Sequence, residues 1–89
     1  MNERQLTIVN RLGLHARAAS KLVNCASAFA AEVWLRRGER EVNGKSIMGV
    51  LTLAAAQGTR IEVRTDGQDE DAAMDALARL VEDRFGEDE

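Results

Sequence analysis

The sequence lacks several residue types on which functional sites often depend. Its 89 residues include one cysteine, one histidine, no proline and no tyrosine. Cys25 therefore has no partner for an internal disulfide, and a metal site built on two histidines is excluded. No apolar run approaches the roughly 18 residues that a membrane span needs, and no signal peptide is evident near Met1. We expect a cytoplasmic protein with no membrane insertion, no metal and no cofactor.

Aromatic residues are also scarce, at 3% of the chain. They form no stripe of stacking residues among the basic ones, which argues against a nucleic-acid partner. Charge is divided unevenly along the chain. Residues 1–65 hold ten Lys/Arg and five Asp/Glu, whereas residues 66–89 hold two and ten. We interpret residues 66–89 as a solvated acidic helix and tail, and the basic first part as favouring an acidic partner or a phosphoryl group.

The apolar pattern alternates between a period of two residues and a helical period. Alternation over residues 5–10, 32–37, 40–43 and 60–66 predicts four strands, with a hairpin at Gly38-Glu39. Helical spacing predicts three helices over residues 16–29, 46–56 and 69–86, the second of them ended by Gly58. In the first helix the buried stripe is expected to include Leu22 and Phe29.

This order, β-α-β-β-α-β-α, predicts a single α+β domain over residues 1–89. Strands that alternate cleanly have one wet face, so we expect an open-faced β-sandwich. Its mainly antiparallel four-stranded sheet would be covered on one face by all three helices. Trp34 would then lie on the open face, resting on the stems of neighbouring arginines.

His15 lies where the first strand leads into the first helix. Histidine is a mediocre helix cap, so its place here favours a reason beyond local stability, although a structural histidine remains the alternative. A helix start offers unpaired backbone N–H groups and a partial positive charge, which suit a phosphoryl group carried on the ring. The amides of Ala16, Arg17 and Ala18 are the candidate donors. Arg17 adds a guanidinium within reach of the same oxygens.

The motif Gly-Leu-His-Ala-Arg at residues 13–17 and the run Asn-Gly-Lys-Ser-Ile-Met-Gly-Val at residues 43–50 closely resemble the HPr family of phosphocarriers. These proteins belong to the bacterial phosphoenolpyruvate-dependent phosphotransferase system, and the similarity spans nearly the whole chain. The resemblance implies a carrier and not an enzyme. It implies that enzyme I loads a phosphoryl group onto Nδ1 of His15, with Arg17 stabilising it, and that IIA-type domains unload it. The alternatives are a carrier of the nitrogen branch, resembling NPr, or a non-catalytic binding module on the same fold.

One position departs from the pattern, because the family usually has proline after the motif arginine and this chain has Ala18. Proline in a first helical turn fixes φ where its missing N–H does no harm. We therefore predict that Ala18→Pro stabilises the fold and changes phosphoryl transfer little.

Ser46 is expected to cap the second helix. The resemblance also implies a regulatory role, as the target of an HPr kinase/phosphorylase, in which a phosphate would add negative charge beside the docking surface. Ile47, Met48, Lys45 and Lys21 are the candidate partner-binding residues, and core packing is the alternative for Ile47 or Met48. A carrier that docks two partners in turn through one small surface is expected to be a monomer.

Overall fold

The chain forms one four-stranded sheet and three α-helices in a computed structural model that describes residues 1–89. The elements are β1 (Asn2–Thr7), α1 (Ala16–Ser27), β2 (Glu32–Arg37), β3 (Arg40–Asn43), α2 (Ile47–Thr52), β4 (Arg60–Asp66), α3 (Glu70–Glu82) and a 3₁₀ turn, η1 (Arg84–Gly86). The predicted β-α-β-β-α-β-α order is confirmed.

The strands lie in the order β1-β4-β2-β3, and every neighbouring pair is antiparallel. β4 is the central partner of both β1 and β2, pairing Ile61 with Leu6 and Val63 with Leu35. These four side chains are buried. The alternation seen in the sequence thus places one face of the sheet in the core.

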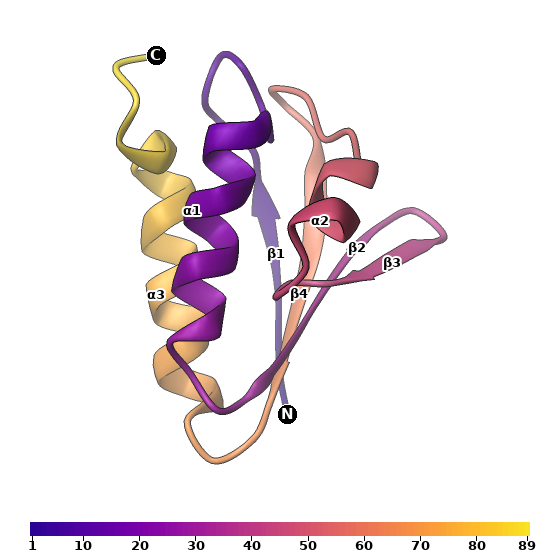
Figure 1. Cartoon of the computed structure of the whole chain (residues 1–89), viewed down its shortest axis with the longest axis vertical. Helices are drawn as coiled ribbons and strands as arrows, with labels where there is room; N and C mark the ends of the chain where they lie inside the picture. The colour runs from indigo at the N-terminus through magenta and orange to yellow at the C-terminus, as the bar shows by residue number, and fades with distance from the viewer.

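All three helices cover that buried face, as Figure 1 shows, with α1 and α3 side by side and α2 beside α1. The core between the helices and the sheet contains twenty buried residues. Phe85, Leu22, Leu35 and Ile61 are among its largest fully buried side chains. The open-faced α+β sandwich expected from the sequence is therefore the observed fold.

The other face of the sheet carries polar side chains and Trp34. The Arg64 guanidinium lies 6.0 Å from the centre of the Trp34 ring. Arg36 forms an ion pair with Glu62 on the same face. The placement of Trp34 against an arginine is as predicted.

Four elements have boundaries other than predicted, and one of them is the third helix, which ends at Glu82 and not at residue 86. The first strand begins at Asn2 and ends at Thr7, although Ile8 beyond it is still fully buried. Phe29 lies after the end of α1 and is only half-buried, so it does not extend the buried stripe. The second helix ends at Thr52, well before Gly58, because Ala54 adopts a left-handed φ of 50° that no α-helix can include.

Candidate functional site

The loop before α1 is held in place by contacts between distant parts of the chain. Gly13 has a φ of +65°, and a Cβ there would lie 2.5 Å from the carbonyl oxygen of Ala55. Leu14 donates its backbone N–H to that same oxygen at 2.9 Å. The buried Asn10 side chain donates to the Gly13 carbonyl at 2.8 Å. Glycine is thus required where the loop passes the α2–β4 connection, and the loop delivers His15 to the start of α1.

His15 is the N-cap residue of α1, as predicted, with extended backbone and no side-chain capping bond. The first helical hydrogen bond is donated by Ala19 to the His15 carbonyl at 2.8 Å. The N–H groups of Ala16, Arg17 and Ala18 have no acceptor in the protein. Three unpaired amides and the positive end of the helix dipole therefore lie directly after the imidazole.

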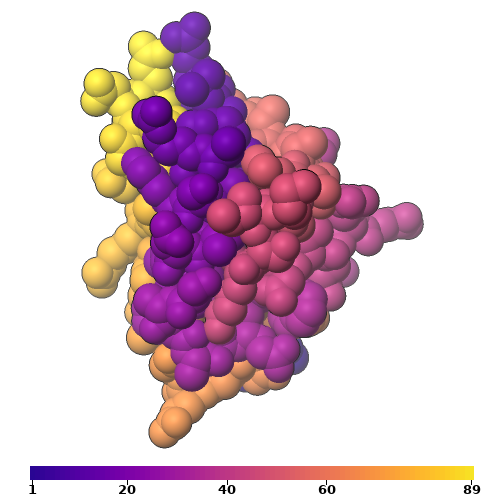
Figure 2. All heavy atoms as spheres, viewed as in Figure 1, coloured from indigo at the N-terminus to yellow at the C-terminus, as the bar shows by residue number.

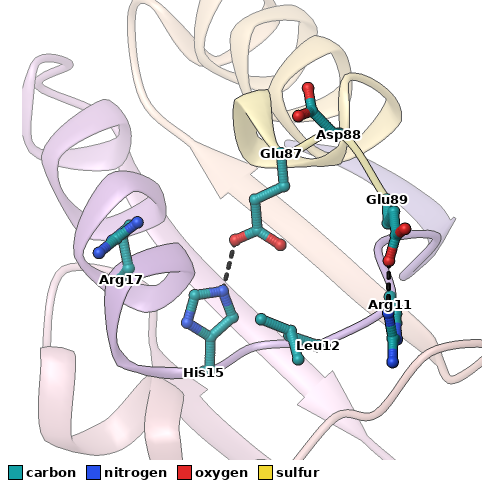
Figure 3. A pocket seen from close by; sticks show the side chains of 7 residues that line it. All are labelled: Arg11, Leu12, His15, Arg17, Glu87, Asp88 and Glu89. Carbon is teal, nitrogen blue, oxygen red and sulfur yellow. Dashed lines mark hydrogen bonds and ion pairs between the residues drawn. The ribbon is translucent and has the colours of Figure 1, made fainter.

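A hollow of about 340 Å³ opens beside the imidazole. It is lined by Arg11, Leu12, His15, Arg17, Glu87, Asp88 and Glu89, all of which Figure 3 shows. The Arg17 guanidinium forms no hydrogen bond or ion pair within the protein, so it remains free for an anion. The structure brings His15 and Arg17 together at one site, as the sequence predicted.

The end of the chain completes this site, which the sequence did not reveal. Phe85 is fully buried with a left-handed φ of 55°, and it turns the chain back toward the loop before α1. Lys21 fixes this turn by donating to the Phe85 carbonyl oxygen at 2.6 Å. Figure 2 shows the last residues, in yellow, lying against the dark purple segment that includes the loop before α1, at one end of the molecule.

Glu87 contacts the imidazole itself. Its Oε2 is hydrogen-bonded to Nε2 of His15, and its Oε1 accepts from Nδ2 of Asn10 at 3.0 Å. The interpretation of the C-terminal residues as a solvated tail was therefore wrong for Glu87, whose side chain is only 17% exposed. The ring is also less open than expected, with 29% of the His15 side chain exposed.

The environment of Glu87 keeps its carboxylate ionised. Partial burial raises the pKa of Glu87, but hydrogen bonds from His15 and Asn10 outweigh that effect, so the pKa lies below its ordinary value. An ionised carboxylate is an acceptor only. Glu89 joins the tail to the loop before α1 at a second point. Arg11 pairs with the Glu89 side-chain carboxylate at 2.6 Å and donates its backbone N–H to the Glu89 main-chain oxygen at 2.8 Å.

Ser46 is the N-cap of α2, as predicted, and its Oγ accepts from the Gly49 N–H at 3.1 Å. Ile47 and Met48 follow it with 41% and 73% of their surfaces exposed, so neither is a core residue. Lys45 and Lys21 are engaged within the fold, since Lys45 donates to the Phe29 carbonyl at 2.8 Å and Lys21 to that of Phe85. Sequence reasoning missed Leu12, which lines the hollow with 66% of its surface exposed. The available signal in the sequence was an apolar residue three positions before His15, in the loop that precedes the first helix.

Two further features concern ligands and membranes. No group of three or more His, Cys, Asp or Glu side chains lies close enough together to hold a metal ion. None of the helices combines the length and the apolar character that crossing a bilayer requires. Cys25 is half-buried, and this burial raises the pKa of its thiol, as expected for a residue at the edge of the core.

The fold and the site define a small α+β protein that presents one imidazole at an anion-binding helix start. Comparison with known proteins gives this class a family. Residues 2–83 match the family model described as the PTS HPr component phosphorylation site. The phosphocarrier protein HPr of Xylella fastidiosa (strain Temecula1) is 58% identical over 88 residues, which cover 99% of each chain.

The phosphocarrier protein NPr of Shewanella violacea is 48% identical, over 96% of this chain and 93% of that protein. The crystal structure of HPr-C-His from Thermoanaerobacter tengcongensis superposes with a TM-score of 0.96 at 40% identity, covering all of both chains. The chain belongs to the HPr family and is a phosphocarrier protein of the phosphotransferase system, a carrier of phosphoryl groups and not a catalyst. Its partners are accordingly proteins of that system.

Proposed function

We propose that His15 accepts a phosphoryl group from enzyme I on Nδ1 and donates it to IIA-type domains. The observation that carries this proposal is the position of the ring, at the N-cap of α1 and in a hollow that it shares with Arg17. Figure 3 supports it, because the ring nitrogen not bonded to Glu87 faces the start of α1. A phosphoryl group on that nitrogen would meet the free amides of Ala16, Arg17 and Ala18.

The Arg17 guanidinium supplies the charge that the helix start lacks. It would bind the same oxygens as a planar fork of donors, and no carboxylate in the fold competes for it. With no metal cluster or lysine at the phosphoryl position, the group is held only moderately, which suits a carrier that must release its cargo. We propose that the carrier acts in the cytoplasm as a monomer and as one domain over residues 1–89.

The test is incubation with phosphoenolpyruvate and enzyme I. The wild-type protein should form an acid-labile, base-stable phosphoryl adduct, and His15→Ala should form none. Arg17→Ala should be labelled more slowly, with the fold unchanged by circular dichroism. Absence of an adduct on the wild-type protein would instead favour a binding module. Offering the loaded carrier to sugar-type and nitrogen-type IIA domains distinguishes the sugar branch from the nitrogen branch.

The docking surface that we propose extends from the hollow at His15 and includes exposed apolar side chains. It comprises Leu12, Ile47 and Met48, whose side chains are all exposed, and α2, which carries the last two, lies against α1. Scattered apolar residues are common on surfaces, but Leu12 shares the hollow with His15, and an exposed apolar side chain beside a reactive group suits a contact area. We include Lys21 and Lys45 as partner-binding residues because their ammonium groups, although each donates to a backbone carbonyl, add positive charge for acidic partners.

We further propose that Ser46 is a regulatory phosphorylation site. A phosphate there would lie beside the exposed Ile47 and Met48, so its negative charge would oppose docking of an acidic partner. Ser46 Oγ now accepts from the Gly49 N–H. Phosphorylation would keep part of this helix cap, because phosphate oxygens can also accept that hydrogen bond. Incubation with an HPr kinase/phosphorylase and ATP should label the wild type, and equal labelling of Ser46→Ala would contradict this proposal.

A further inference from the structure

The hydrogen bond between Glu87 and His15 has a geometry that fixes which ring nitrogen carries the proton. Glu87 is an ionised carboxylate, so it can only accept a hydrogen bond from Nε2. Nε2 must therefore carry the ring proton when the imidazole is neutral. The lone pair then resides on Nδ1, which faces the start of α1 (Figure 3).

The carboxylate is itself held in place from three sides. Asn10, fully buried, donates one N–H to Glu87 and the other to the Gly13 carbonyl. Its own Oδ1 is buried with no partner, so the amide is oriented by its two donors alone. The tail that carries Glu87 is anchored before it by buried Phe85 and after it by the pairing of Glu89 with Arg11. This is more support than a solvated tail requires.

We propose that Glu87 is a positioning residue for phosphoryl transfer: its carboxylate keeps the proton on Nε2 and so keeps Nδ1 available as the nucleophile. This inference rests on the proposed function of His15. During loading, the Nδ1 lone pair forms the N–P bond while the bond between phosphorus and the donor breaks and its electron pair leaves with the donor. The ring becomes positively charged, and the Glu87 carboxylate stabilises that charge.

Unloading reverses the same steps with the same proton. The acceptor attacks phosphorus, the N–P bond breaks, and its electron pair returns to Nδ1. Because the proton stays on Nε2 throughout, the ring departs as neutral imidazole and not as a far more basic imidazolate. Glu87 would therefore act in both directions without touching the phosphoryl group.

Asn10 makes Glu87→Gln an informative variant. The Asn10 amide offers only an N–H toward Glu87, so a glutamine would turn its oxygen to Asn10 and its NH₂ to His15. That NH₂ would donate to Nε2 and favour the proton on Nδ1, which blocks the nucleophile. Glu87→Ala, in contrast, leaves the proton free to distribute between the two nitrogens. The structure thus predicts a larger loss of transfer for the amide than for the truncation.

The experiment measures proton position and transfer rate separately. Ring ¹⁵N chemical shifts of the unphosphorylated protein should place the proton on Nε2 in the wild type and on Nδ1 in Glu87→Gln. Loading by enzyme I should slow by about tenfold in Glu87→Ala, and in Glu87→Gln by more, toward the ~10⁴-fold known for a misplaced histidine tautomer. Glu82→Gln is the matched control, since it makes the same change at an exposed glutamate of α3 that lines no part of the hollow.

Two results would overturn the proposal. One is a proton that stays on Nε2 in Glu87→Gln, whatever its transfer rate. The other is a proton that moves to Nδ1 with no loss of transfer relative to Glu82→Gln. Failure of the proposed function is distinguishable, because labelling of His15→Ala would show it, whereas the proton positions are read on protein that has never met a phosphoryl donor.

Discussion

The backbone at Ala18 provides a stability test that follows directly from the start of α1. Ala18 is the third residue of the helix, and its N–H has no acceptor. Proline at this position would lose no hydrogen bond, and its ring would occupy the direction of the unused N–H. A proline compatible with the native φ stabilises by about 0.4–1 kcal/mol, mainly by restricting the unfolded chain.

An opposing cost arises because Ala18 is fully buried. Extra methylenes in a closely packed core cost about 1–3 kcal/mol. The ring Cδ, however, is bonded to nitrogen and occupies the direction of the unused N–H, and the buried Cβ keeps its position. We therefore expect the gain to prevail and the melting temperature to rise by about 2–8 °C for a domain of this size.

The assay is thermal unfolding followed by circular dichroism, with enzyme I-dependent labelling measured on the same samples. Labelling should change little, because the amides of Ala16 and Arg17 and the Arg17 guanidinium remain. A lower melting temperature would refute the reasoning and show that the packing around Ala18 cannot admit the ring. Ala30→Pro provides a contrast, because the Ala30 N–H donates to Asp69 and proline would remove that hydrogen bond. This variant should be destabilised.

Three other substitutions test the framework of the site. Ser46→Ala removes the cap of α2 and should lower the stability by about 1 kcal/mol, or about 4–8 °C in melting temperature, whereas Ser46→Asp should retain the cap. Gly13→Ala should lower it by more than about 1 kcal/mol, because φ is +65° and Cβ would meet the Ala55 oxygen at 2.5 Å; equal stability would contradict the described loop. Asp69→Asn should destabilise the protein at pH 7, because bonds from the Ala30 and Ala31 amides lower the pKa of the carboxyl. The carboxylate's contribution is complete above the unfolded pKa and lost as pH falls through the folded one. The difference in melting temperature between wild type and Asp69→Asn should therefore shrink below about pH 4, and a constant difference down to pH 2 would contradict it.

Local sequence patterns predicted the bounds of three strands and the start of α1. β2, β3 and β4 have the predicted bounds, because the alternation of β2 and β4 is complete inside the sheet and β3 follows β2 through the tight hairpin. The position of His15 at the N-cap was predicted because the apolar spacing changes there from the two-residue period of a strand to the period of a helix. These features depend on residues close together in the sequence, so the sequence alone was sufficient for them.

The errors at α2 and at the C-terminal tail concern contacts between distant residues. α2 ends earlier than predicted, at the point where Arg37 of β2 donates to the Leu53 carbonyl at 2.7 Å. This hydrogen bond joins two distant segments, so the spacing of apolar residues within the helix could not predict it. Glu87 contacts His15 across 72 positions of the chain. An acidic run ending a soluble chain is usually solvated, so composition predicted a free tail. The exception depends on Phe85, whose burial after α3 could be found only from the packed structure.

The contact between the tail and His15 must also be compatible with docking. Glu87 bonds Nε2, on the opposite side of the ring from the nitrogen that faces Arg17 and α1. A partner that delivers or removes a phosphoryl group approaches the second nitrogen along the open hollow. The Glu87 contact can therefore persist in both complexes, and docking does not have to break it. Had the tail bonded Nδ1 instead, each partner would have had to displace it before transfer, and the same contact would inhibit the carrier. The side of the ring that Glu87 occupies is what makes it a support for the reaction and not a barrier to it.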